Sequence, residues 1–140
     1  MTASDNQLVG LVFVSHSAKL AEGAAELASQ MAGPDVRLLA VGGAPDGTIG
    51  TDPDRIATAI RSADSGAGVL VICDLGSAIL ATESAIEMLD ATLAARVRLS
   101  GGPFVEGAVI ASVQASIGQS LDDVRHAAEE ARDLDKRVGR

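Results

Sequence analysis

The sequence predicts a doubly wound α/β fold in a single domain, and three observations support this. Short runs of aliphatic residues alternate with longer stretches of helical periodicity, and no Pro-, Gly- or Ser-rich linker divides residues 1–140. Hydrophobic residues make up 47% of the chain, which is enough for one buried core. Such alternation is typical of right-handed βαβ units, so we expect one mainly parallel, four-stranded sheet with helices on both faces.

The first strand is predicted at the apolar run Leu8–Val14, which Ser15, His16 and Ser17 follow. A run of Val and Leu that ends in small polar residues and precedes an Ala-rich segment indicates a buried parallel strand that leads into a helix. We expect that helix over Ala18–Met31, because apolar residues recur there every three or four positions. His16 would then lie at the carboxyl end of the strand.

The remaining elements continue the alternation. Further apolar runs predict strands, and apolar residues three or four positions apart predict helices. The predicted strands are Val36–Val41, Val69–Cys73 and Val97–Leu99. The predicted helices are Asp54–Ala63, a segment capped by Ser77 that extends to Leu89, Val105–Ile117, and a charged C-terminal helix at about residues 120–137, Leu121 to Arg137. A long loop, Gly42–Pro53, follows the second strand.

His16 and Asp74 are the predicted catalytic residues. In the common doubly wound order 2-1-3-4, the first and third strands are neighbours whose connections leave in opposite directions, so a crevice opens between their carboxyl ends. His16 and Asp74 follow those two strands. A carboxylate that bonds Nδ1 of an imidazole holds its tautomer and orientation, and leaves a lone pair on Nε2 for attack. We therefore expect His16 to be the nucleophile and Asp74 to orient and stabilise it.

The surroundings of this pair suit phosphate. Small residues precede two of the predicted helices, so backbone N–H groups and two helix dipoles would converge on the crevice. The candidate phosphate-binding residues are Ser15, Ser17, Gly76 and Ser77. Thr48 and Thr51, in the long loop, are candidates for the crevice rim, because long loops in compact domains are often functional. A polar turn without a function is the alternative for these two threonines.

Composition argues against several classes of partner. The net charge is −8, from 19 acidic and 11 basic residues, and the chain has no Trp or Tyr. A phosphate backbone would be repelled and bases would find no stacking platform, so nucleic acid is not an expected partner. No segment approaches the ~20 consecutive apolar residues of a membrane span, and the N-terminus shows no targeting pattern. We expect a cytoplasmic protein that does not contact a membrane.

Familiar catalytic motifs are missing from the sequence. It contains no G-x-S-x-G elbow for a serine nucleophile, no P-loop and no G-x-G-x-x-G after the first strand. The paired acidic residues of a two-component receiver domain are also missing there. Two scattered histidines and one cysteine do not suggest a zinc site, so no metal and no tightly bound cofactor are expected.

Three other features have structural explanations. Cys73 lies in an apolar run and is expected to be a small buried side chain rather than a nucleophile. His126 lies in a charged helical stretch and is expected on the surface. The segment Val105–Ile117 is apolar on all sides, so it must be buried in the core or lie at an interface.

Four blocks of the sequence, in this order, resemble one known family. They are VFVSHSAKLAEGAAELASQM from Val12, IGTD at Ile49–Asp52, VLVICDLGSAILATESAIEML from Val69 and VRLSGGPFVEGAVIASVQAS from Val97. Together they resemble the phosphotransferase subunits of phosphoenolpyruvate-dependent dihydroxyacetone kinases, which are relatives of the mannose-type enzyme IIA. The DLGSA segment that begins at Asp74 separates this branch from the sugar-transporting members.

The resemblance implies a mechanism through a phosphohistidine. A phosphoryl group would pass from the carrier protein phospho-HPr to His16, and then to ADP on a second kinase subunit, DhaL. The ATP so formed would phosphorylate dihydroxyacetone on a third subunit, DhaK. The resemblance also implies a homodimer and, because this chain has only 140 residues, a donor that is a separate protein. Two alternatives remain open, a component of a mannose-type sugar transporter and a regulatory module that senses phosphorylation.

Overall fold

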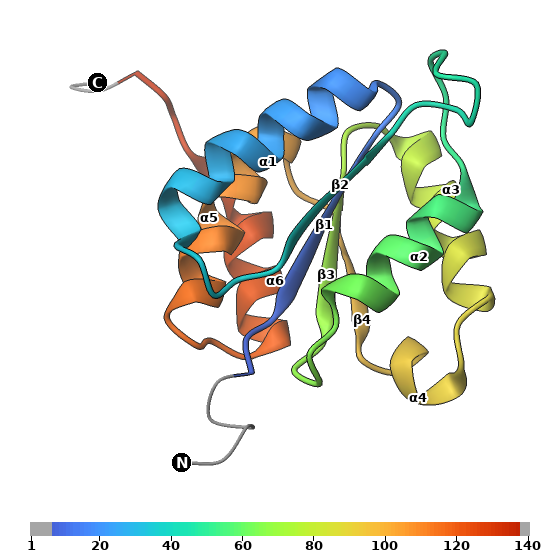
Figure 1. The fold of residues 1–140 in the computed structure, drawn as a ribbon. Helices are drawn as coiled ribbons and strands as arrows, with labels where there is room; N and C mark the ends of the chain where they lie inside the picture. Colours follow the sequence, from blue (N-terminus) through green and yellow to red (C-terminus); the bar gives the residue numbers. More distant parts are fainter. Residues whose placement is uncertain (1–6, 138–140) are drawn as a thin grey trace.

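The computed structural model describes residues 7–137 of the chain. Within them, one sheet contains the four strands β1 (Gly10–Ser15), β2 (Leu38–Gly42), β3 (Val69–Cys73) and β4 (Val97–Ser100). The strand order is β2-β1-β3-β4, and every neighbouring pair is parallel. The predicted order 2-1-3-4 is therefore confirmed (Figure 1).

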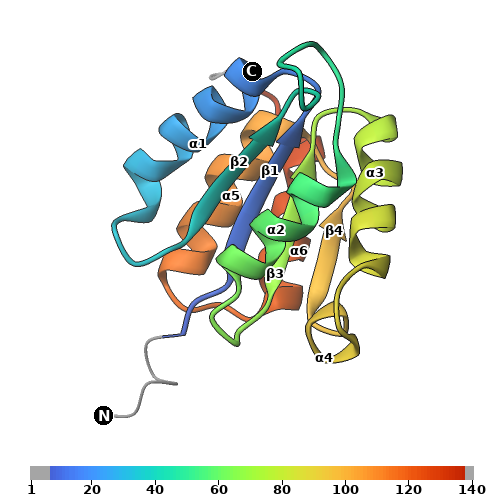
Figure 2. The same ribbon diagram turned by 45° about the vertical axis from the view of Figure 1, so that its right-hand side comes forward.

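Helices cover both faces of the sheet, as the sequence predicts (Figures 1 and 2). One face packs against α1, α5 and α6, and the other against α2, α3 and the short α4, which the sequence analysis does not anticipate. The helices are α1 (Ala18–Ala32), α2 (Pro53–Ala63), α3 (Gly76–Glu87), α4 (Ala91–Ala94), α5 (Phe104–Ser116) and α6 (Leu121–Glu130). Across residues 7–137, no helix has both the length and the apolar composition needed to cross a bilayer.

The core consists of two apolar layers, one on each side of the sheet. Val12 and Val71 point towards α2 and α3, whereas Phe13 and Ile72 point towards α1, α5 and α6, and all four side chains are fully buried. A strand that is covered on both faces needs apolar residues at every position, because its side chains alternate between the faces. This is why β1 and β3 are continuous apolar runs in the sequence.

The predicted C-terminal helix is too long. α6 ends at Glu130, and a single 3₁₀ turn, η2 (Ala131–Asp133), follows, whereas the sequence predicts a helix as far as Arg137. Buried residues recur at helical spacing only up to Ala131, and the two positions that would follow on that face, Leu134 and Asp135, are both exposed. An acidic residue there can neither pack on the sheet nor favour the negative C-terminal end of a helix.

Candidate active site

The candidate site lies where β1 and β3 end, at the place where the sequence predicts a crevice. The two strands are adjacent, and the backbone N–H of Asp74 donates to the carbonyl oxygen of Val14 at 3.0 Å. The chain leaves β1 for α1 on one face of the sheet and leaves β3 for α3 on the other face (Figure 2). Side chains at these strand ends are thus brought together although they are far apart in the sequence.

The structure brings His16 and Asp74 into direct contact. Nδ1 of His16 lies 3.0 Å from Oδ1 of Asp74, and the two side chains are 20% and 10% exposed. An ionised carboxylate only accepts hydrogen bonds, so we assign the ring proton to Nδ1. Nε2 then carries the lone pair and accepts a hydrogen bond from the hydroxyl of Ser77 at 2.7 Å. This is the tautomer that a nucleophilic Nε2 requires.

Four donors surround the carboxylate of Asp74. Oδ1 accepts from Nδ1 of His16 at 3.0 Å and from the Leu75 amide at 2.7 Å. Oδ2 accepts from the Ser15 hydroxyl at 2.9 Å and from the His16 amide at 3.0 Å. Burial would raise the pKa of Asp74, but the hydrogen bonds from His16 and Ser15 outweigh it and lower the pKa below its ordinary value. Asp74 is therefore ionised at neutral pH.

The N-terminus of α3 opens towards Nε2 of His16. Its N-cap is Leu75, which makes no side-chain cap, and the first helical hydrogen bond runs from the Ala78 amide to the Leu75 carbonyl at 3.0 Å. The prediction that Ser77 is the N-cap is therefore wrong, because the helix already begins at Gly76. Gly76 and Ser77 are exposed residues, and within the described chain no acceptor is found for their amides, as is usual in the first turn of a helix.

Ser15 and Ser17 belong to the connection from β1 to α1, and their hydroxyls have partners within the protein. The Ser15 hydroxyl is fully buried, donates to Asp74 and accepts from the Ser17 amide at 3.0 Å. Ser17 is the N-cap of α1, and its hydroxyl accepts from the Leu20 amide at 3.3 Å. A phosphate contact from Ser15 would require its hydroxyl to leave both partners.

The loop after β2 lies against the backbone of the site. The Gly50 amide donates to the carbonyl oxygen of His16 at 2.9 Å. Thr48 is exposed, and its hydroxyl donates to Oδ1 of Asp46 at 2.6 Å within the loop's own turn. Thr51 is half-buried. The loop therefore lies beside His16, while a rim function for the two threonine side chains stays a prediction.

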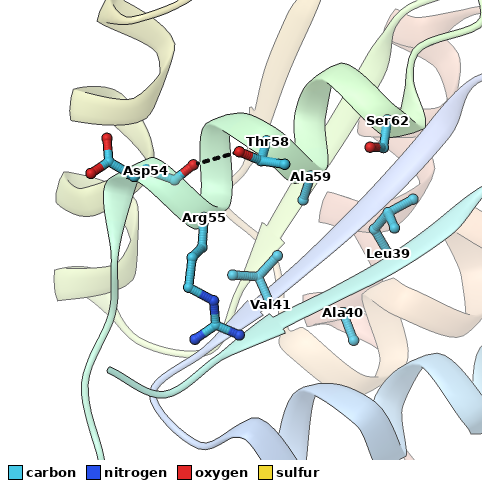
Figure 3. A pocket seen from close by; sticks show the side chains of 8 residues that line it. All are labelled: Leu39, Ala40, Val41, Asp54, Arg55, Thr58, Ala59 and Ser62. Carbon is cyan, nitrogen blue, oxygen red and sulfur yellow. Dashed lines mark hydrogen bonds between the residues drawn. The ribbon is translucent and has the colours of Figure 1, made fainter. Parts of the chain in front are cut away.

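A groove on the surface involves other residues than those of the candidate site. It is an open groove of about 350 Å³ between α2 and β2 (Figure 3). Arg55 lines it and donates to the carbonyl oxygens of Gly42 and Gly43 at 3.3 Å each. A Cβ on Gly42 would lie 2.5 Å from the carbonyl oxygen of Ser17, so a glycine is required where β2 passes the turn after β1. The groove contains none of the predicted site residues.

The interpretations of Cys73 and His126 are confirmed. Cys73 is buried, and burial raises the pKa of its thiol to about 11, which keeps it protonated. His126 is 72% exposed and lies 3.4 Å from Glu130 on the surface of α6. Among residues 7–137, no three His, Cys, Asp or Glu side chains gather in a way that would hold a metal ion.

Comparisons with known proteins show the family of the chain. The sequence model of a phosphotransferase-system (PTS) family, EIIA-man, described as the PTS system fructose IIA component, matches residues 10–125. The phosphoryl donor subunit DhaM of a PEP-dependent dihydroxyacetone kinase from Klebsiella michiganensis is 45% identical over 120 residues, which cover 84% of this chain and 25% of that protein. A DhaM of dihydroxyacetone kinase 2 from Listeria innocua is 37% identical over 117 residues, which cover 84% of this chain and 94% of that protein.

One solved structure is similar in both sequence and fold. It is the crystal structure of EF1359, a protein of unknown function, with 33% identity and a TM-score of 0.79 over 95% of this chain and 99% of that chain. The present chain spans about a quarter of the Klebsiella relative's length and nearly all of the Listeria relative's length. The matched family region, residues 10–125, contains both His16 and Asp74. The chain therefore belongs to the EIIA-man family and, within it, to the DhaM phosphoryl donor subunits of PEP-dependent dihydroxyacetone kinases.

Proposed function

We propose that this protein carries a phosphoryl group on Nε2 of His16 and delivers it within a PEP-dependent dihydroxyacetone kinase. The observation that carries the proposal is the hydrogen bond from Nδ1 of His16 to Asp74, because it leaves the lone pair on the exposed side of the ring. The names of the curated relatives support the choice of dihydroxyacetone kinase over a sugar transporter.

The first step is transfer from a phosphohistidine of the donor, HPr. The Nε2 lone pair of His16 attacks the phosphorus, the new N–P bond forms as the donor's N–P bond breaks, and the released electron pair stays on the donor's imidazole. His16 retains the proton on Nδ1, so its phosphorylated ring is cationic. The ionised carboxylate of Asp74, 3.0 Å away, stabilises that charge.

The N-terminus of α3 receives the phosphoryl oxygens. Ser77 releases Nε2 when the lone pair attacks, and its hydroxyl is then free to donate to a phosphoryl oxygen. The unpartnered amides of Gly76 and Ser77 and the positive end of the helix dipole favour the same negative charge. Phosphoryl transfer through a loose transition state needs mainly this kind of positioning and charge stabilisation.

The second step returns His16 to its starting state. A β-phosphate oxygen of ADP on DhaL attacks the phosphorus, the N–P bond breaks, and its electron pair returns to Nε2. The resulting ATP phosphorylates dihydroxyacetone on DhaK. Both visiting proteins must approach Nε2, and the surrounding segments expose apolar side chains for such contacts, with Ile49 74%, Leu75 61% and Leu80 66% exposed. We place this exchange in the cytoplasm, without a metal or a tightly bound cofactor on this chain.

The direct test is the intact mass of the protein after incubation with phosphoenolpyruvate, enzyme I and HPr. The wild type is expected to gain one acid-labile phosphoryl group, and His16→Ala none, whereas His126→Ala is labelled like the wild type. Adding DhaL with ADP should then remove the label and, with DhaK, form dihydroxyacetone phosphate. Retention of the label in His16→Ala contradicts the proposal. Discharge only to a sugar through membrane subunits, or no discharge at all, would favour the transporter or the regulatory module.

The homodimer that the resemblance implies is part of the proposal. The helices α1 and α5 lie side by side, and large apolar residues on them or next to them are exposed, among them Met31 of α1 at 53% and Ile117, the C-cap of α5, at 64%. Exposed apolar patches on a folded protein mark interaction surfaces, and we propose a second copy of this chain as the occupant. Light scattering should give the mass of a dimer for the wild type and of a monomer for Ile117→Glu. A wild-type monomer at working concentrations would contradict the dimer.

A further inference from the structure

The hydroxyl of Ser15 lies in the candidate site but takes no part in the proposed transfer steps. It is the last residue of β1, and its side chain is fully buried. Its hydroxyl donates to Oδ2 of Asp74 at 2.9 Å and accepts from the Ser17 amide at 3.0 Å. The hydroxyl therefore already donates one hydrogen bond and accepts another below the surface. It does not face a phosphoryl group that arrives at Nε2.

The bond from Ser15 constrains the plane of the Asp74 carboxylate. A carboxylate can rotate about its Cβ–Cγ bond, and each hydrogen bond to one of its oxygens opposes that rotation. At Oδ2 the partners are the Ser15 hydroxyl and the His16 amide, so Ser15 supplies the only side-chain donor to that oxygen within residues 7–137. With Oδ2 held, Oδ1 points at Nδ1 of His16.

We infer that Ser15 is a positioning residue, which sets the tautomer of His16 by orienting Asp74. Outer hydrogen bonds of this kind fix the ring orientation and basicity of functional histidines in other sites. The inference rests on the proposed role of His16 as the phosphoryl carrier, but it concerns how the resting ring is prepared. It replaces the direct phosphate contact that the sequence suggests for Ser15.

The chain contains a matched control for this role at the end of β4. Ser100 is also the last residue of its strand and is 2% exposed. Its hydroxyl accepts from the amide two residues later, that of Gly102, at 3.1 Å, as the Ser15 hydroxyl does from Ser17. The two serines therefore share the same local turn, whereas only Ser15 donates to a carboxylate.

The experiment compares Ser15→Ala with Ser100→Ala, each with and without Asp74→Ala. In otherwise wild-type protein, Ser15→Ala should slow phosphorylation by phospho-HPr about tenfold, which corresponds to one hydrogen bond to a charged group. Ser100→Ala should leave the rate unchanged. In the Asp74→Ala background, Ser15→Ala should cause no further loss, because its effect passes through Asp74. Each rate is divided by the fraction of protein that can be labelled, so partial misfolding does not imitate the effect.

A second readout does not depend on phosphoryl transfer. The chain has two histidines, so ¹⁵N spectra of histidine-labelled protein can be assigned with His126→Gln. Ser15→Ala should increase the share of the tautomer with the proton on Nε2 of His16, and Ser100→Ala should not. Equal losses from Ser15→Ala in both Asp74 backgrounds, or an unchanged tautomer, would overturn the inference. Labelling of His16→Ala would instead contradict the proposed function and leave the tautomer result standing.

Discussion

Asp74 is the residue on which the geometry of the site depends most. Its two oxygens accept from the ring and amide of His16, the hydroxyl of Ser15 and the amide of Leu75. A carboxylate with its accepting positions filled cannot easily turn, so His16 is held in one orientation. The bonds from His16 and Ser15 keep the pKa of Asp74 low despite partial burial, so its negative charge is available for the proposed phosphorylation of the ring.

We expect Asp74→Asn to slow phosphorylation of His16 by about ten- to a hundredfold. The change removes a charge-assisted hydrogen bond, worth about 1.5–3 kcal/mol, and the amide can present its NH₂ group to the ring and favour the wrong tautomer. Rapid-quench labelling with phospho-HPr measures the rate. Asp54→Asn, an exposed change on α2, is the control and should behave like the wild type. Equal rates for the two variants would contradict the role of Asp74.

Ser77→Ala should have two opposing effects on the rate of phosphoryl transfer, and the effect that slows transfer should be the larger. In the resting state the variant frees the Nε2 lone pair from a neutral hydrogen bond, worth about 0.5–1.5 kcal/mol. In the transition state it removes a donor to a charged phosphoryl oxygen, worth about 1.5–3 kcal/mol. We expect transfer to slow by about three- to tenfold in the same assay, while Ser84→Ala, an exposed change on the same helix, has no effect. Faster transfer in Ser77→Ala would show that its hydroxyl only blocks the nucleophile.

The contact between His16 and Asp74 could be predicted from the sequence, but the hydrogen bond from Ser15 to Asp74 could not. Each member of the pair directly follows an apolar strand, and neighbouring parallel strands end at the same edge of a sheet. The bond from Ser15 to Asp74 depends on the register in which Val14 pairs with Cys73, and no local pattern reveals that register. A serine next to the predicted N-terminus of a helix is therefore interpreted as a phosphate-binding residue, even when its hydroxyl points into the protein.

At the scale of elements, the open N-terminus of α3 is the feature that distinguishes the site from an ordinary helix end. Ser77 has the favoured residue type for an N-cap, which is why the sequence predicts that role for it. The helix begins earlier because the chain turns directly after Asp74, whose carboxylate accepts from the Leu75 amide. The amides of Gly76 and Ser77 are left for a ligand, and the Ser77 hydroxyl is left for His16.

Gly76 allows one of these amides to be removed without disturbing the helix. A Cβ at Gly76 would meet no atom within 4 Å, and proline is well tolerated at the first position of a helix. Gly76→Pro deletes the N–H, whereas Gly76→Ala keeps it. We expect the proline variant to transfer phosphate about tenfold more slowly than the alanine variant, because it loses a donor to a charged group, with similar melting temperatures. Equal transfer rates would show that this amide does not bind the phosphoryl group.

At the scale of the whole molecule, a stabilising ion pair and the candidate site lie at opposite ends of the strands. Asp64, before β3, and Arg96, before β4, form a bidentate pair at 2.7 and 3.0 Å. The hydrogen bond from Arg96, against a smaller effect of burial, lowers the pKa of Asp64 below its ordinary value. His16 and Asp74 follow β1 and β3 at the carboxyl ends of the strands. The ion pair can therefore be altered without touching the site.

This arrangement predicts a pH-dependent effect of Asp64→Asn. Because the pKa of Asp64 is lower in the folded state, its stabilising contribution is complete above the unfolded pKa of about 3.9 and is lost as the pH falls through the folded pKa. Urea unfolding should show Asp64→Asn to be less stable than the wild type at neutral pH, with a smaller difference at about pH 3. Asp122→Asn, which breaks an exposed pair with Arg98, should cost less. If the difference in unfolding free energy between the wild type and Asp64→Asn became larger as the pH falls, the predicted direction of the pH dependence would be contradicted.

The fold as a whole was predictable because its two periodicities are clear. The strand β3 is an unbroken apolar run, β1 is apolar from Gly10 to Val14, and α2 shows apolar residues at helical spacing. The apolar face expected for α1 was wrong, because its buried residues are alanines, whereas Leu20, Leu27 and Met31 are 45%, 47% and 53% exposed. The end of α6 was not predictable to the same degree, because Leu134 continues an apolar pattern in the sequence although it is 59% exposed. Packing against the sheet, rather than periodicity, decides where that helix stops.

The saturated carboxylate of Asp74 has a consequence for how water takes part in the exchange. With both oxygens engaged and its charge stabilised, Asp74 is unsuited to remove the Nδ1 proton, so that proton remains on the ring through loading and unloading. No proton then has to move between the imidazole ring and bulk water during either step. Phosphorylation in heavy water should therefore proceed at nearly the rate seen in ordinary water, and a large solvent isotope effect would show that the ring is deprotonated on the way.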